Sequence, residues 1–300
     1  EIDRNAKQIV TNRGEFTYGK LVLALGADPI RLPIQGEGAA KILSVNDLAD
    51  YQVFHEALTK PSRVVVLGAG LIGCEFANDL ALAGHEVTVL DLSPQPLNRL
   101  VPEEIGQALQ SRLESLGVTF HMETSLESVS ANLDCQLSNG KVIEADVVLS
   151  AIGLSSRTDL AKTAGLQVSQ GIVVDDFLTT NDPHIHALGD CAEVNGTVLP
   201  FIMPMSIGIH ALAKTLTGAA TKVKYPAMPV VVKTPAYPIV TVPPEKGTEG
   251  HWQIEEFEAG LIARFQTESG CPLGFALGGD ACSLKAELIA EIGRASFVQA

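Results

Sequence analysis

The chain has 300 residues and a formal net charge of −14, with 46% apolar and 5% aromatic residues. This length allows two or three domains, each with its own core. The acidic charge argues against nucleic acid or an anionic membrane as a partner. No apolar run is long enough to cross a membrane as a helix, and no signal-peptide pattern opens the chain. Five cysteines lack CxxC and metal-ligand spacing, so we expect free thiols in a reducing cytoplasm and no metal site.

The first segments of the chain have strand character but no core of their own. Residues 8–10 and 16–18 have the pattern of a hairpin, and the chain starts with Glu1 rather than Met. We therefore expect that an N-terminal portion is absent from this sequence.

Residues 63–91 have the pattern of a dinucleotide-binding unit. A buried parallel strand is predicted at 63–67, a G-x-G-x-x-G turn at 68–73 and a helix at 74–84. In such a unit Gly68 allows the tight turn, Gly70 lets the backbone approach a pyrophosphate, and Gly73 lets the helix pack close to the strand. The helix N-terminus would then present N–H groups and a positive dipole end to the phosphates.

The second strand of the unit, predicted at 85–90, ends at Asp91. A carboxylate at this spacing accepts hydrogen bonds from an adenosine ribose and repels a 2′-phosphate, which favours NADH over NADPH. The alternative is an ordinary glycine-rich turn between a strand and a helix.

Three other apolar strands end in the pattern Ala-x-Gly, at Gly26, Gly153 and Gly189. Each glycine can admit a close neighbour or a positive φ, as expected of related nucleotide-binding modules. Asp190 follows the third turn, where its carboxylate could bind a polyol or ribose. The alternative is that the three strand ends are alike by coincidence.

Residues 206–217 have helical spacing, and Gly218 follows as a candidate C-cap. The positive end of this helix, after Pro204, would stabilise a reduced anionic flavin. The alternative is a plain surface helix.

The order of these segments resembles a known family. LVLALGADP, VVVLGAGLIGCEFA, VTVLDLSPQPLNRLVP, VVLSAIGLSSRT and IHALGDCAEV resemble FAD- and NADH-dependent pyridine nucleotide–disulfide oxidoreductases. VVVKTPAYP at 230–238 and the residues around CEFANDL resemble bacterial rubredoxin reductases. The resemblance implies an α/β fold with two Rossmann-like three-layer nucleotide-binding domains, the NADH domain inserted in the FAD domain, and a small α+β C-terminal domain.

The implied boundaries are 1–32 and 154–225 for the FAD-binding domain, 33–153 for the NADH-binding domain and 226–300 for the C-terminal domain. Within the last, strands are predicted at 230–233, 239–242, 251–256 and 261–266, and a helix at 283–295. Family members open with a first G-x-G-x-x-G turn for the ADP half of FAD, which this chain lacks before residue 20. We therefore expect a fragment that starts inside the FAD domain, and a redox CxxxxC could have preceded it.

The resemblance assigns roles to four more positions. Glu75 would face the flavin and nicotinamide rings and pair with a lysine, either Lys233 or one in the absent segment. Asp190 would bind the ribityl chain of the flavin, and Ile202 would place backbone groups at the ring edge. Lys233 would reach the flavin from the C-terminal domain and favour its reduced, negatively charged form. The simpler alternatives are a helix-terminal acid at Glu75, a packing residue at Ile202 and a solvent-exposed lysine at 233.

These features predict an NADH-dependent flavoprotein that passes electrons to rubredoxin, for alkane hydroxylation or for oxygen or peroxide detoxification, in the cytoplasm and as a monomer or weak dimer. The alternatives are a ferredoxin reductase or NADH oxidase of the same superfamily, or a dinucleotide-binding fragment without turnover. Because rubredoxins are usually acidic, docking would need a local basic or apolar patch, for which Lys222, Lys224 and Lys233 are candidates.

Overall fold

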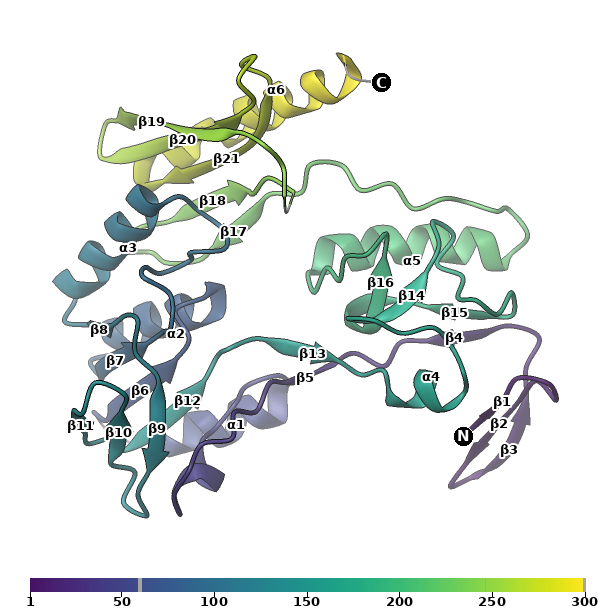
Figure 1. The fold of residues 1–300 in the computed structure, drawn as a ribbon, viewed down its shortest axis with the longest axis horizontal. Coiled ribbons are helices and arrows are strands. Elements are labelled where there is room, and N and C mark those ends of the chain that lie inside the picture. The colour runs from purple at the N-terminus through teal and green to yellow at the C-terminus, as the bar shows by residue number, and fades with distance from the viewer. Residues whose placement is uncertain (59–60, 246, 299–300) are drawn as a thin grey trace. The chain divides into compact units, whose positions relative to one another are not determined.

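The computed structural model describes residues 1–58, 61–245 and 247–298, with side chains up to residue 292 (Figure 1). The chain forms two compact units. The first unit contains Glu1–Ile30 and Leu154–Pro226, and the second contains Arg31–Gly153 and Ala227–Ala300. Across the described ranges, no helix is both long and apolar enough to cross a membrane.

The first unit is built from short strands and two helices. Its elements are β1 (Ile2–Asp3), β2 (Gln8–Thr11), β3 (Gly14–Thr17), β4 (Leu21–Leu23), β5 (Ala27–Pro29), β13 (Leu154–Ser156), α4 (Asp159–Thr163), β14 (Ile172–Val174), β15 (Ile185–Ala187), η2 (Gly189–Cys191), β16 (Ala192–Val194) and α5 (Ile202–Leu216). The first three strands form an antiparallel sheet. Strands β4 and β15 pair in parallel, as do β14 and β16, while β5 and β13 pair antiparallel. The turns after β4 and β15 therefore leave neighbouring strands at the same edge, which is where α/β folds bind their ligands.

The nucleotide half of the second unit has three layers. Its elements are η1 (Ala39–Lys41), α1 (Leu48–Ala57), β6 (Arg63–Leu67), α2 (Leu71–Leu82), β7 (Glu86–Leu90), α3 (Glu103–Ser115), β8 (Thr119–His121), β9 (Leu126–Val129), β10 (Cys135–Leu137), β11 (Val142–Ile143) and β12 (Val147–Ser150). A parallel sheet of order β12-β6-β7-β8 lies in the middle. On β6, Val64 and Val66 pack towards the helices, whereas Val65 and Leu67 pack towards the β9–β11 sheet. Because both faces are buried, the strand is a continuous apolar run.

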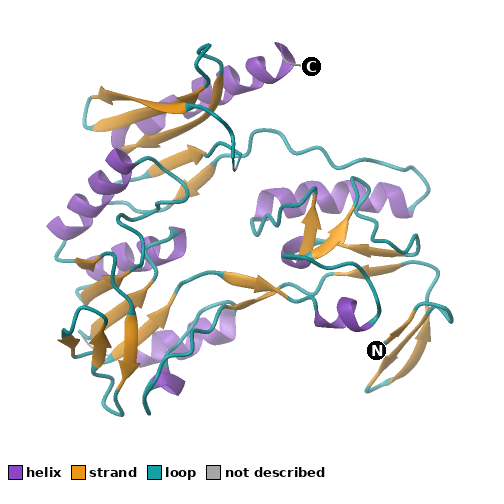
Figure 2. Ribbon diagram, in the orientation of Figure 1, coloured by secondary structure: helices purple, strands orange, loops and turns teal. Residues whose placement is uncertain are grey.

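The C-terminal part of the second unit is an antiparallel sheet of order β17-β18-β21-β20-β19 with a helix along one face (Figure 2). Its elements are β17 (Val230–Val232), β18 (Ile239–Val242), β19 (His251–Phe257), β20 (Gly260–Gln266), β21 (Pro272–Gly278), η3 (Gly279–Leu284) and α6 (Lys285–Val298). Val240, Ile262 and Phe275 of the sheet pack in one cluster with Leu288 of α6. The other face, which carries Ile239, shares one buried apolar cluster with α2 and α3. The segments predicted as separate domains at 33–153 and 226–300 thus share a core.

Three expectations about secondary structure need correction. The helix predicted at 74–84 runs from Leu71 to Leu82, because its first turn already includes Gly73 of the glycine motif. The helix predicted at 206–217 begins four residues earlier, at Ile202, with Pro204 inside its first turn. Proline is tolerated there because the first N–H groups of a helix have no partner within the helix. The central strand of the C-terminal sheet, β21, is not among the predicted strands. Gly218 does follow the C-cap Thr217, with a φ of +98°.

Candidate functional site

The three glycines of the G-x-G-x-x-G turn meet different surroundings in the second unit. Gly68 has a φ of +101°, and a Cβ atom there would lie 2.7 Å from the carbonyl oxygen of Ala151. A Cβ on Gly73 would lie 1.8 Å from the carbonyl oxygen of Gly68. A Cβ on Gly70 would meet nothing within 4 Å. Two glycines therefore permit the close packing of the turn, and the third leaves open space at the start of α2.

The open space at Gly70 has the donors that a pyrophosphate needs. Gly70 is the N-cap of α2, and no side chain caps the helix. The first N–H groups of the helix therefore lack a side-chain acceptor, and they carry the positive end of the helix dipole. The residues present fit the phosphate groups of a dinucleotide.

Asp91 braces this turn. Its Oδ2 accepts the backbone N–H of Ala69 at 2.6 Å, and its Oδ1 accepts that of Ser93 at 2.7 Å. The carbonyl of Ala69 accepts the N–H of Leu97 at 2.9 Å, so both backbone groups of Ala69 are hydrogen-bonded. The ribose role of Asp91 stays a prediction, and the structure adds a bracing role that the spacing did not reveal.

The side chains of α2 reach the segment that follows β17. Oε1 of Glu75 accepts the backbone N–H of Lys233 at 2.7 Å. One turn further along the helix, Oδ1 of Asn78 accepts the N–H of Ala236 at 3.1 Å. The structure therefore brings Glu75 and Lys233 together through the lysine backbone. In the described part of the chain, no ion pair joins the lysine ammonium to this carboxylate.

In the first unit, two glycine turns follow the paired strands β4 and β15. Gly26 and Gly189 have φ values of +71° and +78°. Asp190, the middle residue of η2, is half-buried, and its backbone carbonyl accepts the hydroxyl of Ser156 at 2.7 Å. No hydrogen bond or ion pair within the described residues engages its carboxylate, so the acid is available to a hydroxyl-rich ligand. Gly153, in the second unit, also has a positive φ, of +112°.

Cys191 links these two turns. Its Sγ accepts the N–H of Leu25 at 3.3 Å and lies 3.4 Å from the carbonyl oxygen of Leu188. The side chain is fully buried. Nothing in the sequence spacing of Cys191 signals this contact with residue 25.

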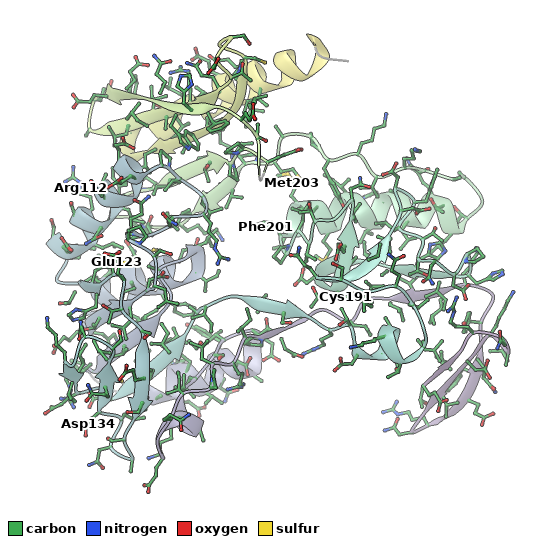
Figure 3. All side chains as sticks on the ribbon, in the orientation of Figure 1. Arg112, Glu123, Asp134, Cys191, Phe201 and Met203 are labelled. Carbon is green, nitrogen blue, oxygen red and sulfur yellow. The ribbon has the colours of Figure 1, made fainter. Side chains whose placement is uncertain are left out.

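The start of α5 is apolar and exposed. Phe201 is its N-cap, without a side-chain cap, and Ile202 is its first residue. Ile202 is 77% exposed, and Phe201 and Met203 are also exposed (Figure 3). Uncapped N–H groups beside exposed apolar side chains suit a flat ring with a polar edge, so these residues fit a flavin.

The three buried cysteines, Cys74, Cys135 and Cys191, form no disulfide within the described residues. Burial, followed by the nearby charges of Asp91 and Glu75, raises the pKa of Cys74 far above its ordinary value. Burial likewise raises the pKa of Cys135 to about 11. Neither thiol would be a thiolate at neutral pH.

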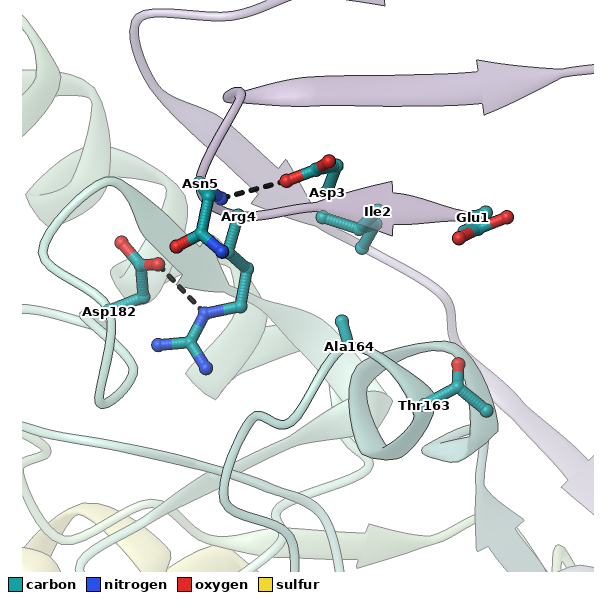
Figure 4. Close-up of a pocket in the computed structure, with 8 residues that line it drawn as sticks. All are labelled: Glu1, Ile2, Asp3, Arg4, Asn5, Thr163, Ala164 and Asp182. Atoms are coloured by element: carbon teal, nitrogen blue, oxygen red, sulfur yellow. Dashed lines mark hydrogen bonds and ion pairs between the residues drawn. The ribbon is translucent and has the colours of Figure 1, made fainter.

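The first unit also has an open hollow of about 470 Å³ beside β1 and α4 (Figure 4). None of the predicted site residues lines it. Its one arginine, Arg4, donates from Nε to Asp182 at 2.9 Å and from Nη1 to the carbonyl of Gly165 at 2.9 Å. We therefore do not assign the hollow to the candidate site.

The fold and the two glycine-turn regions agree with comparisons to known proteins. A family model described as pyridine nucleotide-disulphide oxidoreductase matches residues 1–214. The chain belongs to this family. The expected FAD and NADH cofactors and α/β fold of the family are thereby confirmed. A second model, described as rubredoxin binding C-terminal domain, matches residues 222–292.

Curated relatives cover nearly the whole chain. The rubredoxin-NAD(+) reductase of Acinetobacter baylyi is 52% identical over 267 residues, which are 87% of this chain and 68% of the relative. That of Alcanivorax borkumensis is 44% identical over 97% of this chain and 77% of its own length. The nitric oxide reductase FlRd-NAD(+) reductase of Aeromonas hydrophila is 40% identical over 98% and 76%. The expected resemblance to rubredoxin reductases is thus confirmed.

Solved structures agree on the fold. The ferredoxin reductase for the CYP199A2 system of Rhodopseudomonas palustris is 26% identical, with a TM-score of 0.85 over 94% of this chain and 72% of its own. A NAD-dependent persulfide reductase from A. fulgidus, at 24% identity, has a TM-score of 0.89 over 97% and 60%. The second comparison supports the fold alone.

Proposed function

We propose that this chain passes electrons from NADH, through bound FAD, to rubredoxin. The observation that carries the proposal is the match of residues 222–292 to a rubredoxin-binding domain in a chain that also holds a dinucleotide turn. Relatives that are 52% and 44% identical are named rubredoxin-NAD(+) reductases. The shared core of the C-terminal sheet and the nucleotide half supports the view that the two act as one body.

In this proposal the turn before α2 binds the NADH pyrophosphate. The open space at Gly70 admits the phosphates, and the uncapped helix start donates N–H groups to them. Asp91 keeps the turn in shape and accepts the ribose hydroxyls with its remaining lone pairs. Its negative charge disfavours the extra phosphate of NADPH.

FAD is proposed to be bound by the residues at the ends of β4 and β15. Gly26 and Gly189 let the backbone approach the cofactor, Asp190 accepts hydrogen bonds from the ribityl hydroxyls, and the start of α5 at Ile202 supplies apolar contact and N–H donors. When bound, FAD supplies the conversion of a two-electron donor into single electrons for the acceptor. Gly153 is proposed to shape the turn beside Gly68.

Glu75 and Lys233 are proposed as the catalytic pair of side chains. The carboxylate of Glu75 would orient the nicotinamide end of NADH. The ammonium of Lys233 would favour the negatively charged reduced flavin. Their mutual contact uses the lysine backbone, so the ammonium is not neutralised by Glu75.

Rubredoxin is the proposed partner, with assembly as a monomer or weak dimer and no role for nucleic acid. The net charge of −14 gives little attraction for an acidic carrier at long range. Lys222, one of the docking candidates, is already paired with Asp176 at 3.0 Å. Lys224 and Lys233 are therefore the better candidates for a basic contact. The absence of paired cysteine spacing in the sequence supports the proposal of a reducing cytoplasm.

A second candidate acceptor deserves the same test. Several relatives near 40% identity are named nitric oxide reductase FlRd-NAD(+) reductases, so the physiological acceptor could be the partner of that system. The proposed chemistry of NADH and flavin is the same in both cases.

The test is an anaerobic mixing experiment with FAD-loaded protein. NADH is added first, and oxidised rubredoxin second. Loss of flavin absorbance followed by loss of rubredoxin absorbance supports the proposal. Flavin reduction without rubredoxin reduction would exclude rubredoxin and leave the second acceptor. No flavin reduction would reject the NADH reaction and favour a dinucleotide-binding fragment without turnover.

A further inference from the structure

Two segments far apart in the sequence are joined by a matched pair of hydrogen bonds. Glu75 and Asn78 lie three residues apart on α2, and Lys233 and Ala236 lie three residues apart after β17. The two α2 side chains accept the N–H groups of the two later residues, at 2.7 and 3.1 Å. In the sequence these two segments read CEFANDL and VVVKTPAYP.

Asn78 is an unexpected residue for its surroundings. It is fully buried, and its neighbours Ala77 and Leu80 belong to the apolar core. Asparagine is a weak helix former, and burying its amide costs free energy unless both ends are bonded. Its Oδ1 accepts the Ala236 N–H, and its Nδ2 donates to Asp79 at 3.1 Å. The amide is therefore satisfied, although an apolar residue would suit the core better.

The segment that Asn78 holds is a stiff turn. The hydroxyl of Thr234 donates to the carbonyl of Tyr237 at 2.6 Å, and the N–H of Tyr237 donates back to the Thr234 carbonyl at 2.9 Å. Pro235 has a fixed φ inside this turn. A bond at Ala236 consequently fixes where the N–H of Lys233 points.

We infer that Asn78 is a positioning residue for NADH-dependent flavin reduction. It holds the 233–237 turn so that the Lys233 N–H restrains one oxygen of the Glu75 carboxylate. Asn78 need not touch substrate or cofactor, because it acts through the turn and Glu75. The inference rests on the proposed function, in which Glu75 orients the nicotinamide.

The competing explanation is that Asn78 only fastens the C-terminal sheet to the nucleotide half. Thr241 offers a matched control, because its hydroxyl also joins the C-terminal sheet to the nucleotide half, at another point of the same sheet. It is fully buried on β18, and its hydroxyl donates to the carbonyl of Leu100 at 2.9 Å and lies 2.8 Å from that of Phe275. Thr241→Val removes this fastening at constant size and leaves the Glu75–Lys233 bond intact.

The first experiment measures flavin reduction by NADH in a single turnover of the FAD-loaded protein. Asn78→Ala should lower the limiting rate about tenfold with little change in the NADH dissociation constant, because orientation and not affinity is lost. Asn78→Asp keeps an oxygen that accepts the Ala236 N–H, but it loses the donor to Asp79 and places two carboxylates side by side, so it should recover only part of the rate. Thr241→Val should match the wild type. Equal rates in all four proteins would overturn the inference.

The second experiment does not depend on activity. Residue-resolved amide exchange in the isotopically labelled protein reports the Lys233 N–H directly. Asn78→Ala should speed exchange at Lys233, whereas Thr241→Val should not. If both variants lower thermal stability alike and leave amide exchange at Lys233 unchanged, Asn78 only attaches the C-terminal sheet to the nucleotide half, and the inference is wrong. If NADH does not reduce the flavin of the wild-type protein, the proposed function is rejected. Amide exchange at Lys233 would still decide whether Asn78 positions the turn.

Discussion

The Glu75 carboxylate accepts a hydrogen bond from the backbone N–H of Lys233 at 2.7 Å, so the contact between these residues does not depend on the lysine side chain. The bond and the ammonium charge can therefore be changed separately. A lysine that held Glu75 through an ion pair would not allow this, because its replacement would remove both at once.

Replacing Lys233 by methionine should slow flavin reduction without unfolding the protein. The backbone bond to Glu75 stays, and the side chain is exposed, so we expect a change in unfolding free energy within about 0.5 kcal/mol. Loss of the cation should lower the limiting rate of flavin reduction about tenfold, which corresponds to about 1.4 kcal/mol. Stopped-flow absorbance measures this rate, and Lys233→Arg serves as the charge-retaining control. A methionine variant as fast as the wild type would remove Lys233 from the mechanism.

Alanine at Gly70 should affect NADH binding, whereas alanine at Gly73 should affect stability. The space beside Gly70 is open and its φ is −74°, so Gly70→Ala should fold normally but raise the NADH dissociation constant at least about tenfold, because the methyl group occupies the phosphate space. A Cβ at Gly73 would press on the Gly68 carbonyl, so Gly73→Ala should lose about 1–3 kcal/mol of stability. Thermal melting and NADH titration together test both. Similar effects of the two variants would contradict the assignment of the phosphate site.

Asp91→Ala should combine a loss of stability with a loss of nucleotide selectivity. Two backbone N–H groups lose their acceptor, which should cost about 1–3 kcal/mol. Without the negative charge, the ratio of kcat/KM for NADH over NADPH should fall about tenfold or more. Leu92→Ala is the matched control, because this neighbour is 74% exposed. An unchanged ratio in the Asp91 variant would mean that Asp91 only stabilises the turn and does not select the nucleotide.

The core of the dinucleotide unit was predictable because its signals are local. The sequence placed the strand at 63–67, and the structure has β6 at Arg63–Leu67. Strands with alternating or continuous apolar residues, such as Ile239–Val242, were also located. The start of α5 does not follow from the sequence, because the helical spacing is clear only after Pro204, which stands in the first turn. The strand β21 was missed because its glycines at 274 and 278 hide the strand pattern.

Within the candidate site, only the tight turn around the three glycines was predictable, because it follows from a local motif. The binding roles of these glycines and of Asp91 stay predictions. Asn78, Cys191 and Ser156 make their contacts with residues 158, 166 and 34 positions away, so no local pattern reveals them. The sequence did not decide whether Glu75 pairs with Lys233 or with another lysine. Residue types also do not reveal that the contact uses the backbone N–H of Lys233.

Asp190→Ala should weaken FAD binding and leave the turn in place. The Ser156 hydroxyl bonds the backbone carbonyl of Asp190, so this bond does not need the side chain. In protein loaded with FAD and then desalted, we expect the ratio of FAD to protein to fall at least several-fold, with Asp190→Asn in between. Ser156→Ala tests the turn itself. Full FAD retention in the alanine variant would remove Asp190 from the flavin site.

His186 should make the first unit sensitive to acid. Burial, and next the positive charge of Lys20, lowers the pKa of its imidazole. The side chain is only 2% exposed; Thr179 Oγ1 lies 3.2 Å from its Nδ1, and within the described residues its Nε2 has no partner. In the unfolded chain an imidazole has a pKa of about 6.5. The unfolded state therefore binds more protons as pH falls below that value, so stability is full above it and decreases towards the folded-state pKa.

Denaturant unfolding at pH 7.5, 6.5 and 5.5 measures this decrease. His121 contributes in the same direction, because burial, followed by the charge of Lys141, also lowers its pKa. The informative quantity is therefore the difference between the wild type and His186→Gln, with His121→Gln as the control. His186→Gln should flatten part of the pH dependence by removing one titrating group, and a slope as steep as that of the wild type would assign the acid sensitivity to other groups.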